Sequence, residues 1–371
     1  MSGDLLGGQL ILALRELLPQ LDFVGIGGPR MAAAGMAVWF PLESLAVRGY
    51  VEVLKHFPEI VGIRRRLRRR LLADPPDLFI GIDAPDFNLA LESTLKAHGI
   101  PTVHYVSPAI WMWRCKRIHR IKRAVTKMLT LFPFEARLYR DAGIEVAFVG
   151  HPLVDVLDAV PKRAAAREQL KLPASAPVVA LLPGSRQSEL EYMADLFIQT
   201  AKIIHGRIPA ARFLAPLATR ETRALFETAL YRNDAADLPL TVLFGHAHDA
   251  LAAAEVALVA SGTATLEAAL LGTPMVITYK MPVASHWLLR GKGYLPYYGL
   301  PNILAGEFVV PEIIQDDATP QTLSAAMLNL LGDEAIRTRL ASKFGALNLS
   351  LGRGAARQAA LAILPLLADV T

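Results

Sequence analysis

Short apolar runs alternate along the chain with longer segments in which apolar residues recur at helical spacing. This alternation predicts a parallel β-sheet covered by helices. Helices are expected between the strands, for example over 86–97 and 190–206. The pattern favours an α/β fold of two Rossmann-like halves. The predicted strands are 23–26, 78–82, 102–105, 127–131 and 146–149 in the first half, and 178–182, 211–216, 240–244, 256–260 and 274–278 in the second.

A turn at Gly150, His151 and Pro152 closes the last strand of the first half and marks the boundary between the two halves. We therefore predict an N-terminal domain over 1–153 and a C-terminal domain over 154–344. The tail, 345–371, is rich in Ala and Leu and predicts a helix that packs on the N-terminal domain or on a partner chain. Two such halves imply a cleft with sites at the carboxyl ends of the strands.

The composition excludes several classes of protein. A length of 371 residues suggests two domains, and 53% hydrophobic residues exclude a disordered chain. The single Cys115 excludes an intrachain disulfide, and the nine histidines show no metal-ligand spacing, so neither a metal nor a cofactor is expected. Asp4 stands where a signal peptide would be basic, and no apolar run approaches the roughly 18 residues of a membrane span. We expect a cytoplasmic protein.

The excess of positive over negative charge lies entirely in the first half of the chain. Residues 1–150 hold 20 Lys and Arg against 14 Asp and Glu, a balance of +6, whereas the rest hold 19 against 20. Arginines beside an apolar strip favour an anionic membrane surface over nucleic acid, although a solvated helix face stays open. A second basic stretch runs from Arg114 to Lys127. The predicted membrane-facing residues are Val51, Val53, Leu54, Phe57, Ile60, Val61, Arg64, Arg65, Arg66, Arg68, Arg69 and Arg70.

The first loop with candidate chemistry follows the strand at 78–82. Asp86 is expected to cap the next helix, because Pro85 precedes it at the helix start. That leaves Asp83 at the strand tip, where an open parallel sheet presents catalytic groups. Its carboxylate is a candidate general base toward a substrate hydroxyl.

Two loops of the second half are candidates for binding a nucleotide diphosphate. Gly184, Ser185 and Arg186 follow a strand and precede a helix predicted to begin with a Ser188/Glu191 capping box. A glycine turn before a helix N-terminus suits a phosphate, and an arginine adds a bidentate cation. The second loop repeats this arrangement, with Glu267 one turn into the helix as a candidate ribose contact; its turn residues are Ser261, Gly262 and Thr263. The alternative is that these residues bind no ligand and serve only as helix caps or as exposed surface side chains.

A fourth loop, 300–306, places Asn302 among apolar residues. This asparagine is either a turn former or a ligand contact. No G-x-S-x-G elbow occurs, which argues against an α/β-hydrolase.

Taken together, these loops resemble those of lipid-A-disaccharide synthases, a family of inverting glycosyltransferases of the GT-B type. The 81–88 loop and the 104–108 segment, with Trp111 and Trp113, are the most specific matches. The other matching stretches are Ser2, Gly3 and Asp4 with Gly7, then 27–31, 182–186, 260–267 and 300–306.

The resemblance implies transfer of 2,3-diacylglucosamine from its UDP donor to 2,3-diacylglucosamine 1-phosphate, giving a β-1,6-linked disaccharide 1-phosphate and UDP. Asp83 would deprotonate the acceptor hydroxyl, and Arg186 would neutralise the departing UDP. Gly184, Ser185, Ser261, Gly262, Thr263, Glu267 and Asn302 would hold the donor, and Ser2, Gly3 and Asp4 would lie on the acceptor side. The family needs no metal or cofactor and acts peripherally at the inner membrane of Gram-negative bacteria; a homodimer is possible.

Members of this family normally open with a central strand and a turn of the type Ile-Ala-Leu-Val-Ala-Gly-Glu-Ala-Ser-Gly-Asp. Here the sequence opens at Met1-Ser2-Gly3-Asp4, and the first strand of the N-terminal sheet is expected to be missing. Its loss would expose strand edges on both neighbours. The alternatives are a peptidoglycan-type glycosyltransferase, a UDP-GlcNAc 2-epimerase, or a non-catalytic nucleotide-binding protein at a membrane surface.

Overall fold

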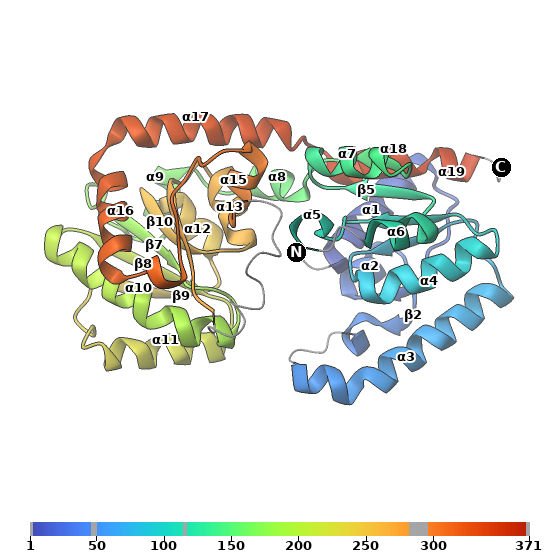
Figure 1. Ribbon diagram of the computed structural model, residues 1–371, viewed down its shortest axis with the longest axis horizontal. Coiled ribbons are helices and arrows are strands. Elements are labelled where there is room, and N and C mark those ends of the chain that lie inside the picture. The colour runs from blue at the N-terminus through green and yellow to red at the C-terminus, as the bar shows by residue number, and fades with distance from the viewer. Residues whose placement is uncertain (1–2, 46–49, 114–116, 282–295, 369–371) are drawn as a thin grey trace. The chain divides into compact units, whose positions relative to one another are not determined.

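The computed structural model describes residues 3–45, 50–113, 117–281 and 296–368. The chain divides into two compact units, one formed by residues 1–152 with 351–371 and the other by residues 153–350 (Figure 1). Each unit is an α/β layer structure with parallel strands, as the alternating pattern predicted.

Two parallel sheets form the first unit. The larger has the order β3 (Phe79–Ile82), β4 (Thr102–Tyr105), β5 (Lys127–Thr130) and β6 (Glu145–Phe148), and the smaller pairs β1 (Val24–Gly27) with β2 (Ala37–Pro41). The helices are α1 (Gly3–Leu17), α2 (Pro29–Ala33), α3 (Tyr50–Ala73), α4 (Pro85–Ala97), α5 (Ile110–Trp113), α6 (Ile118–Ala124), α7 (Pro133–Asp141), α18 (Ala355–Ile363) and α19 (Pro365–Ala368).

Alternate residues of these strands face different helices. Val103 and Leu129 pack with Leu6 and Leu10 of α1, whereas the neighbouring Met128 packs with residues of α4, α6 and α7. This alternation follows from the two-residue repeat of a strand. The larger sheet is therefore covered by helices on both faces.

The inner edges of β1 and β3 do not pair with each other within the described residues. A cavity of about 240 Å³ lies between them, and both strands and α1 line it. α1 begins at the carboxyl ends of both strands, because Gly3 adjoins Ile82 and the Asp4 carboxylate accepts a hydrogen bond from Gly28. The cavity therefore lies where one further parallel strand could pair with both β1 and β3, and its lining is apolar. Its lining includes Val24, Gly25, Ile26, Phe79, Ile80 and Leu14.

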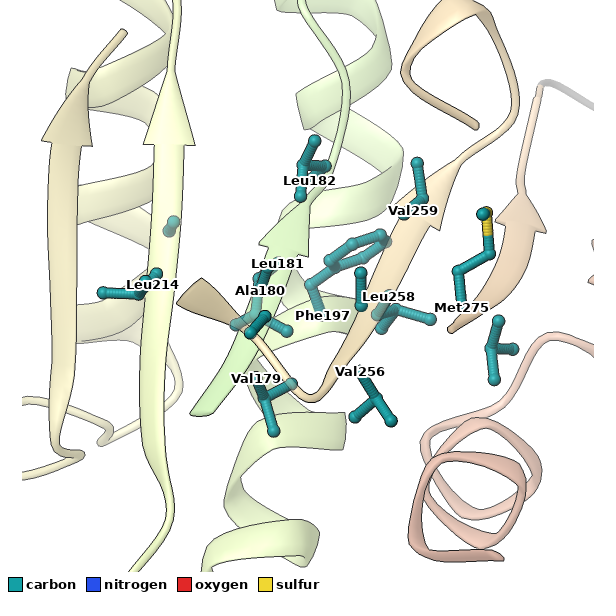
Figure 2. Packing of buried hydrophobic residues seen from close by; sticks show 14 of the residues in the cluster. Val179, Ala180, Leu181, Leu182, Phe197, Leu214, Val256, Leu258, Val259 and Met275 are labelled. Carbon is teal, nitrogen blue, oxygen red and sulfur yellow. The ribbon is translucent and has the colours of Figure 1, made fainter. Parts of the chain in front are cut away.

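In the described part of the second unit, the strands form one six-stranded parallel sheet. Its order is β12 (Glu312–Ile314), β11 (Met275–Tyr279), β10 (Val256–Ala260), β7 (Val178–Leu182), β8 (Arg212–Leu217) and β9 (Leu240–Phe244). Its central strands are buried throughout, as is typical of a parallel sheet covered on both faces (Figure 2). The helices are α8 (Pro152–Leu157), α9 (Arg163–Gln169), α10 (Gln187–Arg207), α11 (Arg220–Arg232), α12 (Ala247–Ala253), α13 (Thr263–Leu270), α15 (Leu300–Ala305), α16 (Pro320–Gly332) and α17 (Glu334–Ser350).

The C-terminal segment returns to the first unit. α18 lies beside α1, and Ala359, Ala360 and Ile363 join the core cluster of the first unit (Figure 1). Lys127 fixes this contact by donating from Nζ to the carbonyl of Ala362 at 2.8 Å. Gly150, at a φ of +86°, lies so close to Leu351 that a Cβ would stand 3.0 Å from its carbonyl oxygen.

The cavity between β1 and β3 generates a prediction about stability. Adding Ile-Ala-Leu-Val-Ala-Gly-Glu-Ala ahead of Ser2 should place a strand between the two edges. Apolar burial and backbone pairing, reduced by the cost of ordering the strand, should give a net stabilisation of about 2–3 kcal/mol. Such a gain corresponds to a rise in Tm of roughly 5–10 °C, measurable by calorimetry.

The control is an extension of equal length with proline at alternate strand positions, because proline cannot donate to a strand ladder. Equal Tm values for the two extended chains would contradict a strand-accepting opening.

Candidate functional site

Asp83 lies directly after β3 and is exposed to solvent. Its backbone N–H donates to the carbonyl of Tyr105 at 2.8 Å, so the loop is still tied to β4. Both Asp83 and Ala84 adopt left-handed backbone conformations, with φ values of +52° and +42°. Such strain in residues other than glycine is typical of functional sites.

Asp86 does not cap α4, contrary to the sequence-based expectation. The N-cap position is occupied by Ala84, and no side chain forms the cap. The Asp86 side chain is instead 79% exposed and forms an ion pair with Arg117. Both aspartates are exposed, and they differ in a way that was not predicted, because Asp86 forms an ion pair with Arg117.

A buried polar network follows the carboxyl end of β4. The Ser107 and Tyr139 hydroxyl oxygens are 2.7 Å apart, and Trp111 donates from Nε1 to Glu135 at 3.1 Å. Burial raises the pKa of the Glu135 carboxyl to about 7. The network fixes the 104–108 segment. Sequence analysis identified Trp111 but missed Glu135 and Tyr139; the side chain of Trp113 lies outside the described part of the chain.

The predicted acceptor-side residues at the start of the chain lie close to the end of β3. Ser2 is outside the described residues, and Gly3 adjoins Ile82. Asp4 is buried, and its carboxylate caps α2 by accepting hydrogen bonds of 3.0 Å from the backbone N–H groups of Gly28, Arg30 and Met31. Its structural role is therefore to hold the start of α2.

In the second unit, the loop after β7 carries Gly184, Ser185 and Arg186. The Glu189 carboxylate accepts hydrogen bonds from the backbone N–H groups of Ser185 and Arg186, at 2.9 and 3.2 Å. The predicted Ser188/Glu191 capping box is thus wrong, because α10 begins at Gln187. The Arg186 side chain is 78% exposed, and only Glu189 forms an ion pair with it among the described residues.

The loop after β10 carries Ser261, Gly262 and Thr263. Ser261 donates from Oγ to the carbonyl of Tyr298 at 3.0 Å, and Gly262 adopts a φ of +152° with open space where a Cβ would stand. Within the described residues α13 has no side-chain cap. Its first turn is thus suited to an anion.

Glu267 lies one turn into α13 and is paired with His248. Its Oε2 is 3.2 Å from His248 Nε2, and its side chain is 19% exposed. This hydrogen bond raises the pKa of His248 above its ordinary value. Glu267 is therefore held in one position by a neighbour that the sequence pattern did not indicate.

The two loops lie side by side because β7 and β10 are neighbours in the sheet. After β7 the chain adds β8 and β9 on one side of this pair, and after β10 it adds β11 and β12 on the other side. The carboxyl ends of the two strands where the strand order reverses are the usual ligand site of an open parallel sheet.

Asn302 has a different setting from the one expected. It is fully buried, and its amide group bonds Val309, Val310 and Glu312, with distances of 2.7–2.9 Å. Its side chain links α15 to β12 and the residues just before it. Its role in the structure is therefore to hold these two elements together.

α3 carries the predicted membrane-facing residues. The side chains of Val51, Val53, Leu54 and Phe57 lie outside the described part of the chain, whereas Ile60 and Val61 are half-buried. Ile63, Leu67 and Leu71 are buried. Arg66 and Arg70 stack on the rings of Phe40 and Trp39, at 5.5 and 3.7 Å from the ring centroids. Arg65, Arg68 and Arg69 leave cationic groups at the surface, whereas Arg64 is half-buried and donates from Nη1 to the carbonyl of Asp86 at 3.5 Å.

Among the described residues, no group of His, Cys, Asp and Glu could hold a metal ion. None of the described helices is both long and apolar enough to cross a membrane.

Comparison with known proteins identifies the family. A family model described as lipid-A-disaccharide synthetase matches residues 1–363. The lipid-A-disaccharide synthase of Methylobacillus flagellatus is 55% identical over 363 residues, covering 98% of this chain and 96% of its own length. The enzyme of the same name from Dechloromonas aromatica is 54% identical over 364 residues, covering 98% of this chain and 95% of its own.

Solved structures show the fold. The UDP-GlcNAc 2-epimerase of Neisseria meningitidis, bound to UDP-GlcNAc, matches with a TM-score of 0.60 at 13% identity over 95% of this chain and 89% of its own. S. aureus MnaA bound to UDP matches with a TM-score of 0.66 at 10% identity over 100% of this chain and 95% of its own. Both are consistent with two Rossmann-like domains of the GT-B type. The chain therefore belongs to the lipid-A-disaccharide synthase family of glycosyltransferases.

Proposed function

We propose that this chain transfers 2,3-diacylglucosamine from its UDP donor to 2,3-diacylglucosamine 1-phosphate, with inversion at the anomeric carbon. The products are a β-1,6-linked disaccharide 1-phosphate and UDP. The observation that carries the proposal is the strained, exposed Asp83 at the carboxyl end of β3. It is supported by the family and by the two adjacent loops after β7 and β10.

Asp83 acts as the general base. Its carboxylate accepts the proton of the acceptor's 6-hydroxyl as that oxygen attacks the anomeric carbon of the donor. The bond from the anomeric carbon to the UDP oxygen breaks at the same time, and the electron pair leaves with UDP. General-base catalysis of this kind contributes about 10²–10⁴-fold to a rate.

The second unit binds the donor. Arg186, with its guanidinium 78% exposed, offers charge to the departing diphosphate. The amides of Ser185 and Arg186 are engaged by Glu189, so a phosphate would have to replace that carboxylate there. Ser261, Gly262 and Thr263 at the start of α13 would hold the diphosphate, and Glu267 would accept the ribose hydroxyls.

The acyl chains of both substrates place the reaction at an anionic membrane surface. α3 supports this part of the proposal, because Arg65, Arg68 and Arg69 are exposed on its surface while Arg66 and Arg70 stack on aromatic rings. Basic residues near an anionic bilayer contribute about 1 kcal/mol each. We infer peripheral association with the inner membrane.

Replacing the base should abolish most turnover while the fold remains. We expect Asp83→Ala and Asp83→Asn to lower kcat by about 100-fold or more, because no carboxylate then accepts the proton. The measurement is UDP release from the acylated donor in the presence of acceptor. Asp77→Ala is the matched control, since Asp77 is an exposed carboxylate that precedes β3 at its other end. Wild-type turnover by Asp83→Asn would exclude Asp83 as the base.

Removing the exposed arginines of α3 that do not stack on aromatic rings should weaken membrane binding. We expect substitution of Arg65, Arg68 and Arg69 by serine to reduce co-sedimentation with phosphatidylglycerol-containing vesicles by about tenfold or more. The control removes three other exposed arginines, Arg137, Arg140 and Arg207, and changes the net charge equally. If both variants lose binding to the same degree, net charge and not α3 is responsible.

A further inference from the structure

We propose that Asn88 is a positioning residue that holds the Asp83 carboxylate in its catalytic place. This proposal rests on the proposed role of Asp83 as the base. It assigns to the α4 segment a function beyond packing, namely to maintain a backbone conformation that Asp83 and Ala84 would not adopt by themselves.

The conformation needs an external restraint. Two consecutive residues with a Cβ, Asp83 and Ala84, have φ values of +52° and +42°. Left-handed backbone brings Cβ close to the following carbonyl oxygen, so residues other than glycine leave it readily unless their surroundings hold them. Any relaxation of this pair would rotate the Asp83 side chain relative to the end of β3.

Asn88 supplies the restraint. It is 9% exposed, and its Nδ2 donates to the carbonyl oxygen of Asp83 at 2.8 Å and to that of Ile82 at 3.3 Å. These two carbonyls flank the point at which the chain leaves the extended conformation of β3. One amide group thus holds the strand end and the strained residue together.

Close packing of α4 on β3 brings Asn88 within reach of the loop. The Glu92 carboxylate, one helical turn further along α4, lies 2.7 Å from His104 Nδ1, and both side chains are fully buried. A Cβ on Gly81 would stand 2.1 Å from Glu92 Oε1 and 3.1 Å from Asn88 Cγ. Gly81 therefore allows α4 to approach β3 closely enough for the Asn88 amide to reach the two carbonyls.

The contact requires a donor and not merely a side chain of this size. Aspartate has the same shape as asparagine, but an ionised carboxylate cannot donate to a carbonyl oxygen. A positioning role therefore predicts that Asn88→Asp and Asn88→Ala both lose activity, whereas a space-filling role predicts that Asn88→Asp retains it.

The experiment measures kcat and KM for UDP release by Asn88→Ala, Asn88→Asp, Asp83→Ala and the double variant Asp83→Ala/Asn88→Ala. We expect each Asn88 variant to lower kcat by about tenfold or more and to change both KM values by less than about threefold. In the double variant, loss of Asn88 should change the residual turnover by less than about twofold, because Asn88 acts through Asp83.

Asn233→Ala is the matched control, since the Asn233 amide also donates twice, to Ala229 at 2.8 Å and to Asp195 at 2.6 Å, but in the second unit. Wild-type kcat for Asn88→Asp, or additive losses in the double variant, would overturn the proposal while leaving the role of Asp83 intact. Failure of both Asn88 variants to fold, seen by circular dichroism, would also overturn a local positioning role. Full activity of Asp83→Ala would instead refute the assignment of Asp83 as the base, on which this proposal rests.

Discussion

Parallel strand pairing is the constraint on which the candidate sites of both units depend. Because every described strand runs parallel to its neighbours, the carboxyl ends within each sheet meet at one edge. Asp83 follows β3 at that edge of the first unit, and the Arg186 and Ser261 loops follow neighbouring strands of the second. The candidate loops of each unit are therefore gathered at the carboxyl ends of its strands.

Buried or half-buried carboxylates then hold these loops in place. Asp4 caps α2, Glu189 caps α10, and Glu312 accepts hydrogen bonds of 2.8 Å from the backbone of Tyr298 and Gly299 at the start of α15. A carboxylate at a helix start satisfies otherwise unpaired N–H groups and is stabilised by the helix dipole. α13 begins at Gly262, and α4 begins at Ala84, without a side-chain cap in the described structure.

The fold was predictable because most of its strands are short apolar runs set between helical segments. Every predicted strand lies within one residue of an observed one, for example β7 and β10. β2 and β12 were not predicted: β2 is an apolar run whose residues are not buried, and β12 has only three residues. Within the described residues β1 and β3 do not pair with each other, and a cavity lies between them. The expectation that a first strand is missing stays a prediction.

A candidate site residue was predictable only where its place in the sequence, directly after a predicted strand, was enough to identify it. Asp83 needed no partner to be identified, whereas the bond between Trp111 and Glu135 joins residues 24 positions apart. Local pattern could not choose between Glu189 and Glu191 as the cap of α10, nor place Asn302 against Val309 and Val310. Likewise, the stacking of Arg70 on Trp39 depends on the approach of α3 to β2, which no local sequence pattern encodes.

Chemical rescue tests the central claim most directly, because it separates proton transfer from positioning. Formate added to the Asp83→Ala variant offers a small carboxylate in the space vacated by the side chain. If Asp83 is the base, the rate of UDP release should rise with formate concentration in this variant and stay constant in the wild type and in Asp77→Ala. A rate in Asp83→Ala that does not respond to formate, in a variant that still binds both substrates, would contradict the assignment.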